Sequence, residues 1–466
     1  MSGVLADRYA SKEMREIWSQ HKKVLLEREL WIEVMKIQNK AGFAIRSEVI
    51  ESYEKVKNNI DLVSINERER ILKHDVKARI DEFNSLVGHQ SIHLGMTSRD
   101  LTENVELWQM KQSLELIEFK SLAFLHKLGE FINSYLDLAI VARTHNVPAQ
   151  VTTLGRRFAS WAEELIFSIQ HLQQLRSRLP LRGIKGAVGT QQDARDLIGP
   201  DISMLDDELA RTLGFQHVAL SSSQIYPRSY DYEVLSSLVQ ISAAATNMST
   251  NIRLMSGYGL ISEGFKNEQV GSSAMPHKVN ARSSERVNGL GVVLKGYTTM
   301  IAEISGNQWN EGDVSCSVIR RVALPNAFYA IDAILDTAIN VVANLTVNKS
   351  AVKTELKEHL PFMLSSKILM KAVDFGRGRE EAHKAIKECA LIAANLLRET
   401  GKNSFFDLVS QDSRLGIPKE FLDSLLLNPL EHTGYAVDQA KEVLIMIKEH
   451  CEGRELLRTY LPNEPI

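Results

Sequence analysis

The chain has 466 residues, of which 44% are hydrophobic and 24% charged, so it can bury a large core and form two or three domains. Its 55 Lys and Arg residues are balanced by 58 Asp and Glu residues, which excludes the basic surface of a nucleic-acid binder. The three cysteines lack metal-ligand spacing and favour free thiols in a reducing compartment. The N-terminus lacks the apolar run of a signal peptide, and no uninterrupted apolar stretch approaches the roughly 20 residues of a membrane span. We therefore predict a cytoplasmic protein without a membrane segment.

In chain order, residues 1–97 form a charged helical segment that ends at a Gly-Met-Thr-Ser turn, where we place the first domain boundary. Three later segments carry apolar side chains at alternating steps of four and three residues, the spacing of a single helical stripe. The stripes are Leu114, Ile117, Ser121, Leu125, Leu128 and Ile132; Val234, Leu238, Ile241, Ala245, Met248, Ile252 and Met255; and Phe328, Ile331, Leu335, Ala338, Val342 and Leu345.

These stripes predict an all-α protein with three domains. Residues 98–347 are expected to form a long central helical bundle, because stripes of this length must be buried against one another. Residues 348–466 are expected to form a C-terminal helical domain that ends in a loose tail over the last six residues. Periodicity alone also fits a helical scaffold without activity.

Four polar segments are candidates for chemistry. Residues 73–76 and 92–100 gather two imidazoles, hydroxyls and a helix-starting Asp, which suits carboxylate or phosphate binding. His89 and His93 stand four apart, but no third metal ligand has matching spacing. Residues 143–157 place His145 before a Pro turn, where a capping role is the more common one, and the glycines of residues 183–190 permit close backbone approach to an anion. Residues 271–281 read Gly-Ser-Ser-Ala-Met-Pro-His-Lys-Val-Asn-Ala.

This last segment matches every specified position of GSSxMPxKxN, and so resembles the signature loop of the fumarase/aspartase superfamily. The order and spacing of all four segments resemble the adenylosuccinate lyase family within it, as do residues 7–14 and 360–363 near the two ends. The resemblance covers about residues 7–450. It implies a homotetramer in which central helices form a twenty-helix core, with active sites shared among three subunits and no metal or organic cofactor.

The resemblance also implies a reaction. The expected activity is elimination of fumarate from adenylosuccinate, giving AMP, and from the succinyl-carboxamide ribotide of purine synthesis (SAICAR, giving AICAR). Removing a proton beside a carboxylate requires preorganised donors and cations, because negative charge builds up in the transition state. The resemblance makes Ser272 the base, Lys278 the cation that stabilises its alkoxide, and His145 the acid that protonates the leaving nitrogen. Glu285 would orient a catalytic histidine, and His74 would lie beside the phosphate or the succinyl group.

Other residues match family positions that hold the nucleotide or the succinyl carboxylates: Arg8, Tyr9, Lys73, Asp75, His93, Thr97, Ser98, Thr144, Gln224, Ser273, Asn280, Arg286, Ser317 and Arg321. The chain departs from the family at Lys73, often Arg, and at Val279 and Ala281, often Arg and Pro. The larger departure is Gly312, where a substrate-binding arginine is expected; Arg320 or Arg321 is the nearest replacement in sequence. Two alternatives stay open, a fumarate-releasing lyase with a different leaving amine and a non-catalytic helical protein derived from a lyase.

Overall fold

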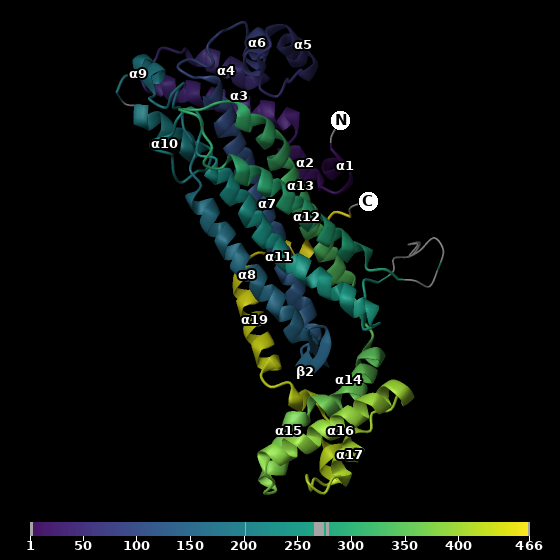
Figure 1. Ribbon diagram of the computed structural model, residues 1–466. Coiled ribbons are helices and arrows are strands. Elements are labelled where there is room, and N and C mark those ends of the chain that lie inside the picture. The colour runs from purple at the N-terminus through teal and green to yellow at the C-terminus, as the bar shows by residue number, and fades with distance from the viewer. Residues whose placement is uncertain (1–2, 201, 265–274, 276–278, 465–466) are drawn as a thin grey trace.

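The computed structural model describes residues 3–200, 202–264, 275 and 279–464. The molecule is elongated, with long helices running along its length and smaller helices gathered at both ends (Figure 1). The first end is formed by short and medium helices: α1 (Val4–Arg8), α2 (Lys12–Ile17), α3 (Gln20–Lys40), α4 (Ser47–Val56), α5 (Leu62–Leu72), α6 (Asp75–Val87), α9 (Gln192–Ile198) and α10 (Ile202–Thr212). Side-chain caps start several of these helices; Ser19, for example, accepts a hydrogen bond from the backbone of Lys22 at 3.0 Å.

The central bundle consists of α7 (Ser98–Ser134), α8 (Leu154–Arg178), α11 (Ser229–Gly257), α12 (Arg282–Ile304) and α13 (Ser315–Asn344). All members of the three predicted apolar stripes are buried in it, including Ser121. The all-α fold and the long bundle are thus confirmed. The strands are short: β1 (Ala139–Thr144) pairs with β2 (Val147–Thr153), and β3 (Ile261–Ser262) pairs with β4 (Thr346–Val347), both antiparallel.

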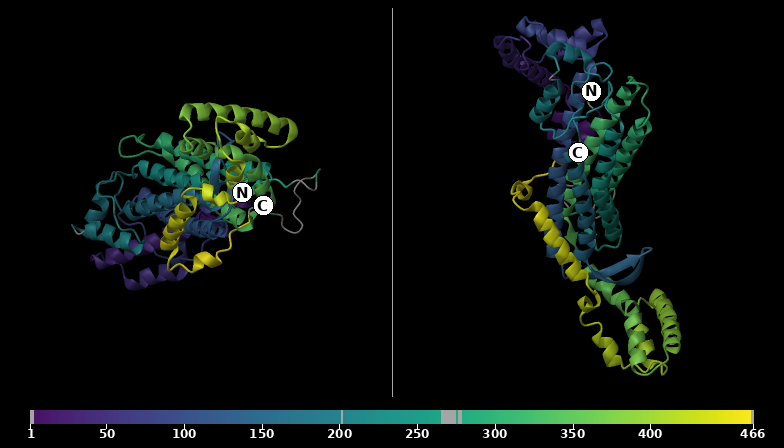
Figure 2. Two further views of the ribbon diagram at one scale, coloured as in Figure 1. Left: turned by 90° about the horizontal axis from the view of Figure 1, so that it is seen from below. Right: turned by 90° about the vertical axis from the view of Figure 1, so that its left-hand side faces the viewer.

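The far end holds α14 (Lys349–Met363), α15 (Ser365–Asp374), α16 (Arg379–Thr400), α17 (Phe405–Gln411), α18 (Lys419–Ser424) and the 3-10 helix η1 (Pro429–His432). The chain then returns along the bundle as α19 (Ala436–Cys451), packed on α7 and α8, and α20 (Leu456–Thr459). Both termini consequently lie on the same part of the molecule, as all views in Figures 1 and 2 show. The division into three domains stays a prediction.

The prediction of a loose C-terminal tail is wrong for its described part. Within the tail, the carbonyl of Asn463 accepts from Asn340 at 3.1 Å and its amide donates to the carbonyl of Tyr9 at 3.4 Å. Just before the tail, the Tyr460 hydroxyl donates to Asp336 at 2.7 Å. Polar side chains on α13 give the tail fixed partners, which a search for apolar periodicity does not detect.

Helix α13 is the apolar centre of the bundle. By length and composition it could cross a membrane, but 78% of its most apolar window is buried inside the protein, as in a core helix. It also continues through Pro325, although proline usually ends a helix. One turn of the helix is supported there by Asn326, whose amide donates to the carbonyl of Val322 at 2.7 Å.

Candidate active site

Apart from His93, the predicted site residues that the structure describes fall into three separate groups. The first surrounds the start of α6 and the start of α13, the second lies on the β1–β2 hairpin, and the third connects the N-terminal segment to the start of α12. Ser272, Ser273 and Lys278 of the signature loop lie outside the described residues.

The first group, called here the α6–α13 group, consists of Lys73, His74, Asp75, Thr97, Ser98, Gln224, Ser317 and Arg321. Lys73 ends α5 in a left-handed conformation (φ 54°), which turns the chain so that exposed His74 caps α6. The Nδ1 atom of His74 accepts from the backbone N–H of Lys77 at 3.3 Å. Asp75 follows at the positive end of that helix, a favourable place for a carboxylate.

Asp75 connects α6 to α13. Its Oδ2 atom lies 3.2 Å from Arg79 and 3.6 Å from Arg321, whose side chain is 68% exposed. Burial opposes ionisation of Asp75, but the charge of Arg79 and a hydrogen bond from the backbone of Val76 outweigh it and lower the pKa of the carboxyl group. Asp75 is therefore an ionised residue that holds cations, not a proton donor at neutral pH.

The hydroxyls of this group lie at two helix starts. Thr97 caps α7, and its backbone N–H donates to Asp100 at 2.7 Å. Ser98 is the first residue of the helix. Ser317 is in the first turn of α13, and its Oγ atom accepts from Arg99 at 2.8 Å. Hydroxyls and cations at helix starts form a suitable site for an oxyanion.

His93 is held by the protein itself. It has a positive φ of 66°, and its Nδ1 atom accepts from the indole N–H of Trp31 at 3.0 Å. Burial lowers the pKa of His93 to about 4, so the ring is neutral at physiological pH. Any contact of His93 with a ligand therefore goes through Nε2.

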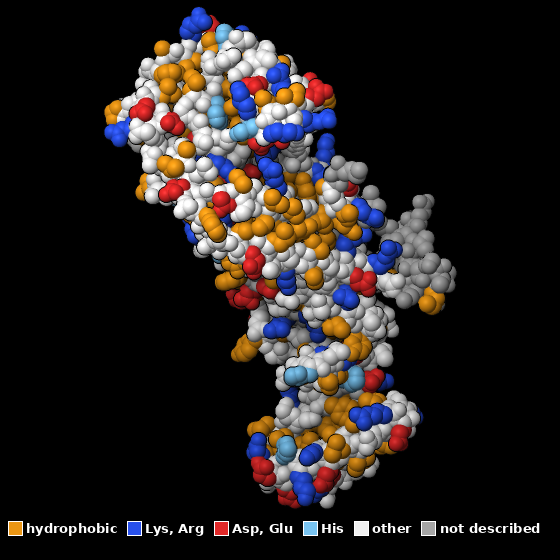
Figure 3. Space-filling model, turned by 45° about the horizontal axis from the view of Figure 1, so that its top comes forward, with side chains coloured by type: hydrophobic (Ala, Val, Ile, Leu, Met, Phe, Trp, Pro, Cys, Tyr) orange, Lys and Arg blue, Asp and Glu red, His pale blue; other side chains and the backbone are white. Residues whose placement is uncertain are grey.

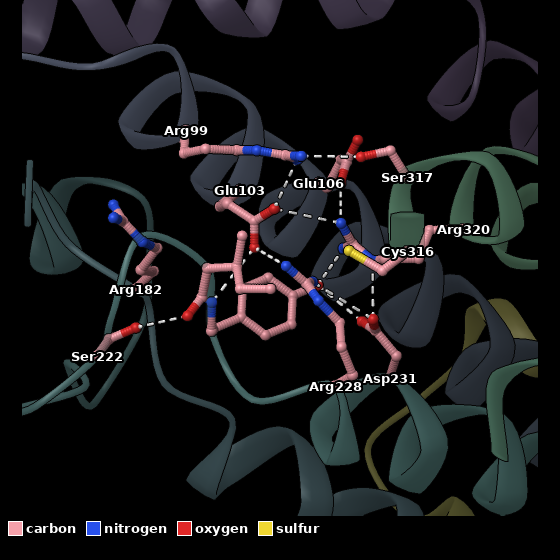
Figure 4. A network of polar contacts seen from close by, with 12 residues as sticks. Arg99, Glu103, Glu106, Arg182, Ser222, Arg228, Asp231, Cys316, Ser317 and Arg320 are labelled. Carbon is pink, nitrogen blue, oxygen red and sulfur yellow. Dashed lines mark hydrogen bonds and ion pairs between the residues drawn. The ribbon is translucent and has the colours of Figure 1, made fainter. Parts of the chain in front are cut away.

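Beneath the α6–α13 group lies a buried ion network, drawn in Figure 4. Arg320 pairs with Asp231 at 2.7 Å and with Glu106 at 2.6 Å, and Arg228 pairs with Glu103 at 2.5 Å. Burial opposes ionisation of Glu106, but the charge of Arg320 dominates and lowers the pKa of Glu106 to about 2. The network joins α7, α11 and α13 at one level and fixes the residues above it.

The second group is the tip of the hairpin. His145 and Asn146 have φ values of 52° and 62°, the two positive angles of the tight turn that fits a two-residue hairpin loop. Thr144 pairs with Val147 across this turn, and both Thr144 and His145 are exposed. Arg143 secures the base of the turn, since it pairs with Glu355 of α14 and stacks 4.3 Å from the ring of Tyr258. The imidazole of His145 is thus presented on a rigid, outward-pointing support.

The third group is the smallest. Tyr9 follows α1, and the guanidinium of Arg286 lies 5.9 Å from its ring. Arg8 and Glu285 are exposed, and Asn280 is partly buried just before α12. The start of α12 is capped by Glu263, whose carboxylate accepts from the backbone of Ser283 at 3.0 Å and of Ser284 at 2.7 Å.

A single chain does not bring these groups together. The start of α6 and the β1–β2 hairpin lie at opposite ends of the bundle (Figure 1). His74 and His145 therefore do not share a site within one subunit. Both groups are open at the surface, which leaves each available to a second surface.

The first part of the glycine-rich segment at residues 183–190 is occupied by carboxylates of the protein itself. The backbone N–H groups of Lys185 and Gly186 donate to Asp100 at 2.8 and 3.0 Å, and that of Ile184 donates to Asp206 at 2.7 Å. A Cβ atom on Gly183 would lie 2.6 Å from Asp206. The predicted close backbone approach to an anion is thus found at residues 183–186, but the anions there are carboxylates of the protein itself.

Sequence reasoning missed Arg99 and the ion network below it. Arg99 and Glu103 are four residues apart on α7, a spacing that usually indicates an exposed helix pair, yet Glu103 is completely buried. Within residues 3–200, 202–264, 275 and 279–464, no group of three or more His, Cys, Asp or Glu side chains is placed to hold a metal ion.

The chain is similar to known proteins over nearly its whole length. Residues 9–296 match the family described as Lyase, and residues 361–443 match the family described as Adenylosuccinate lyase C-terminus. The chain is 34% identical to the adenylosuccinate lyase of Schistosoma mansoni, with 94% of this chain and 93% of that protein covered. It is 32% identical to that of Saccharomyces cerevisiae, with 99% and 97% covered.

Among solved structures, the 3-carboxy-cis,cis-muconate lactonizing enzyme of Pseudomonas putida has the same fold, with a TM-score of 0.83 at 18% identity and 96% of this chain and all of that chain covered. A fumarate lyase from Mesorhizobium sp. BNC1 has a TM-score of 0.81 at 18% identity, with 95% and 99% covered. The sequence matches extend over nearly the whole chain and include the C-terminal part. The chain belongs to the adenylosuccinate lyase family of the fumarase/aspartase superfamily.

Proposed function

We propose that this protein is a carbon–nitrogen lyase that eliminates fumarate from adenylosuccinate to give AMP, and from SAICAR to give AICAR, in the cytoplasm. The observation that carries the proposal is the match of residues 361–443 to the adenylosuccinate lyase C-terminus. The match of residues 9–296 is to a broader lyase family. The C-terminal match is therefore the one that supports adenylosuccinate as the substrate.

In the proposed mechanism Ser272 removes the proton from the carbon beside a succinyl carboxylate, and Lys278 stabilises its alkoxide. His145 protonates the leaving purine nitrogen, a role that suits an exposed imidazole on a rigid turn. The cations and hydroxyls of the α6–α13 group hold the anionic parts of the substrate. Glu285 orients a catalytic histidine, and no metal or organic cofactor takes part.

Assembly of the site requires further subunits. His145 and His74 are separated within one chain, and we propose that a homotetramer brings the hairpin of one subunit to the α6–α13 group of another. The bundle also exposes apolar side chains that such an assembly would cover, among them Val292 on α12, 70% exposed, and Val318 on α13, 68% exposed. Figure 3 shows hydrophobic side chains gathered over the middle of the molecule on the face it draws.

The direct test is the absorbance change on mixing purified protein with adenylosuccinate, and separately with SAICAR. Cleavage of both is expected, and Ser272→Ala should abolish both. Light scattering should give about 210 kDa, four times the 52.4 kDa chain. A protein that ignores both purine adducts but cleaves another succinyl adduct would instead be a lyase with a different amine, the candidate that Gly312 favours. A protein inactive on every succinyl adduct would support a purely structural role.

A further inference from the structure

The glycine at position 312 cannot simply be replaced by the arginine expected there. Gly312 has φ 152°, and an added Cβ atom would lie 3.3 Å from Cβ of Gln224 and 3.4 Å from both Oε1 of Gln224 and Cγ1 of Ile225. The backbone of Gln224 also donates to the carbonyl of Glu311 at 3.0 Å, which fixes the two loops against each other. The positive φ strains any side chain at this position, so a replacement for the expected arginine's charge would come from another residue.

The two arginines nearest in sequence do not supply it. Arg320 is 2% exposed, and its guanidinium is committed to Asp231, Glu106 and Glu103 in the buried network. Arg321 is exposed and pairs with Asp75, and it already occupies its own expected substrate-binding position. Neither is an additional cation for the α6–α13 group.

Arg99 is in a different situation. It is the second residue of α7, directly after Ser98, and its side chain reaches across to α13 (Figure 4). One terminal nitrogen donates to Ser317 at 2.8 Å, and the other lies 3.2 Å from Glu103. The side chain remains 15% exposed. Glu103 is itself held at 2.5 Å by Arg228, so the carboxylate that anchors Arg99 is fixed from below.

The charge of Arg99 also reaches the loop that contains Gly312. Hydrogen bonds from Ser315 are the main cause of the lowered pKa of Asp313, and the charge of Arg99 contributes. A guanidinium has five N–H donors in a planar fork that matches carboxylate and phosphate oxygens. Among the described residues, Arg99 donates to Ser317 and Glu103, which engage only part of this fork and leave donors for a ligand.

We propose that Arg99 is a substrate-binding residue that supplies the cation missing at Gly312 and, together with Ser317, binds an oxyanion of the substrate. The oxyanion is a phosphate or a succinyl carboxylate. The proposal rests on the proposed function, because that function supplies a substrate with both kinds of group. The small network below keeps the guanidinium in place before the substrate arrives.

The test uses Arg99→Gln, which removes the charge, and Arg99→Lys, which keeps the charge without the fork. Arg379→Gln, an exposed arginine on α16 at the far end, is the matched control. Arg99→Gln should raise KM for adenylosuccinate about 30-fold or more with a much smaller change in kcat, since a charged donor to an anion is lost. The KM of Arg99→Lys should lie between those of the wild type and Arg99→Gln. The KM of Arg379→Gln should match that of the wild type.

Calorimetric binding of AMP and of fumarate identifies the oxyanion without requiring turnover. Weaker binding of AMP alone assigns Arg99 to the phosphate, and weaker binding of fumarate alone assigns it to a carboxylate. Unchanged KM and unchanged binding of both in folded Arg99→Gln would overturn the proposal, even if the melting temperature falls, because Arg99 would then only support the network. Arg99→Lys provides the same readouts if Arg99→Gln does not fold. A wild-type enzyme that does not cleave adenylosuccinate would refute the proposed function instead.

Discussion

At the α6–α13 end of the bundle, polar side chains stand on a buried network of paired charges, whereas at the hairpin end His145 stands exposed on a two-residue turn. The first arrangement fixes binding groups within the chain, because each member of the network has several partners. The second fixes only the backbone of the turn. The imidazole of His145 stays exposed and can be contacted by another surface. One end presents several fixed binding groups, and the other presents a single catalytic group on a support.

The largest effect should come from the hairpin end. His145→Ala is expected to lower kcat about 100- to 10,000-fold, the usual contribution of a general acid, with little change in stability because the side chain is exposed. Steady-state kinetics and thermal unfolding measure the two effects. Asn146→Gly is the matched control, because glycine keeps the positive φ of the turn and the imidazole remains. An unchanged kcat in His145→Ala would show that the hairpin end does not supply a catalytic group.

At the α6–α13 end, breaking the buried ion network should lower the free energy of unfolding. Asp231→Ala leaves Arg320 without its 2.7 Å partner and removes the acceptor of the Tyr226 hydroxyl. Loss of one member of a buried ion pair costs about 3–5 kcal/mol, which should appear in denaturant unfolding. Asp438→Ala, an exposed acid 3.7 Å from Lys441, should change stability little. Equal effects of the two substitutions would mean that the network does not fix this end.

A pH dependence follows from His93, which lies beside the network end. Burial gives its folded state a pKa of about 4, below the ordinary value of 6.5. The unfolded state therefore binds the proton more readily, so the contribution of His93 to stability is complete above pH 6.5 and is lost as pH falls toward 4. The slope should reach about 1.4 kcal/mol per pH unit in this window. His93→Asn, which tolerates the positive φ, should be less sensitive to acid; identical pH profiles would contradict the assignment.

The smallest effect concerns Tyr460, the residue just before the C-terminal tail. Tyr460→Phe removes the hydroxyl that donates to Asp336 at 2.7 Å. Hydrogen bonds to charged groups contribute about 1.5–3 kcal/mol, so unfolding should become easier by an amount in that range. Tyr435→Phe, which changes an exposed tyrosine, is the control. No difference between the variants would mean that the Tyr460 hydroxyl does not anchor the C-terminal segment to α13.

The long helices could be predicted because apolar stripes on them leave a clear periodic signal, and their members are buried as expected. The hairpin left a weak signal, since its strands are short and its turn depends on the left-handed conformation of His145 and Asn146. The network could not be predicted, because Glu103 and Arg320 become buried only where three helices meet. Likewise, the glycine turn at Gly183 looked open to a ligand, but distant Asp206 fills the space.

The central claim is that the two ends of one chain serve different active sites, which are completed by other subunits. We expect His74→Ala, which removes the imidazole beside the phosphate or the succinyl group, to be inactive alone, as His145→Ala should be. The most direct test renatures the two variants together at equal amounts. Random assortment should leave about one quarter of the sites with both histidines, and about that share of wild-type activity should return. A mixture that forms the same oligomer but stays inactive would contradict the account.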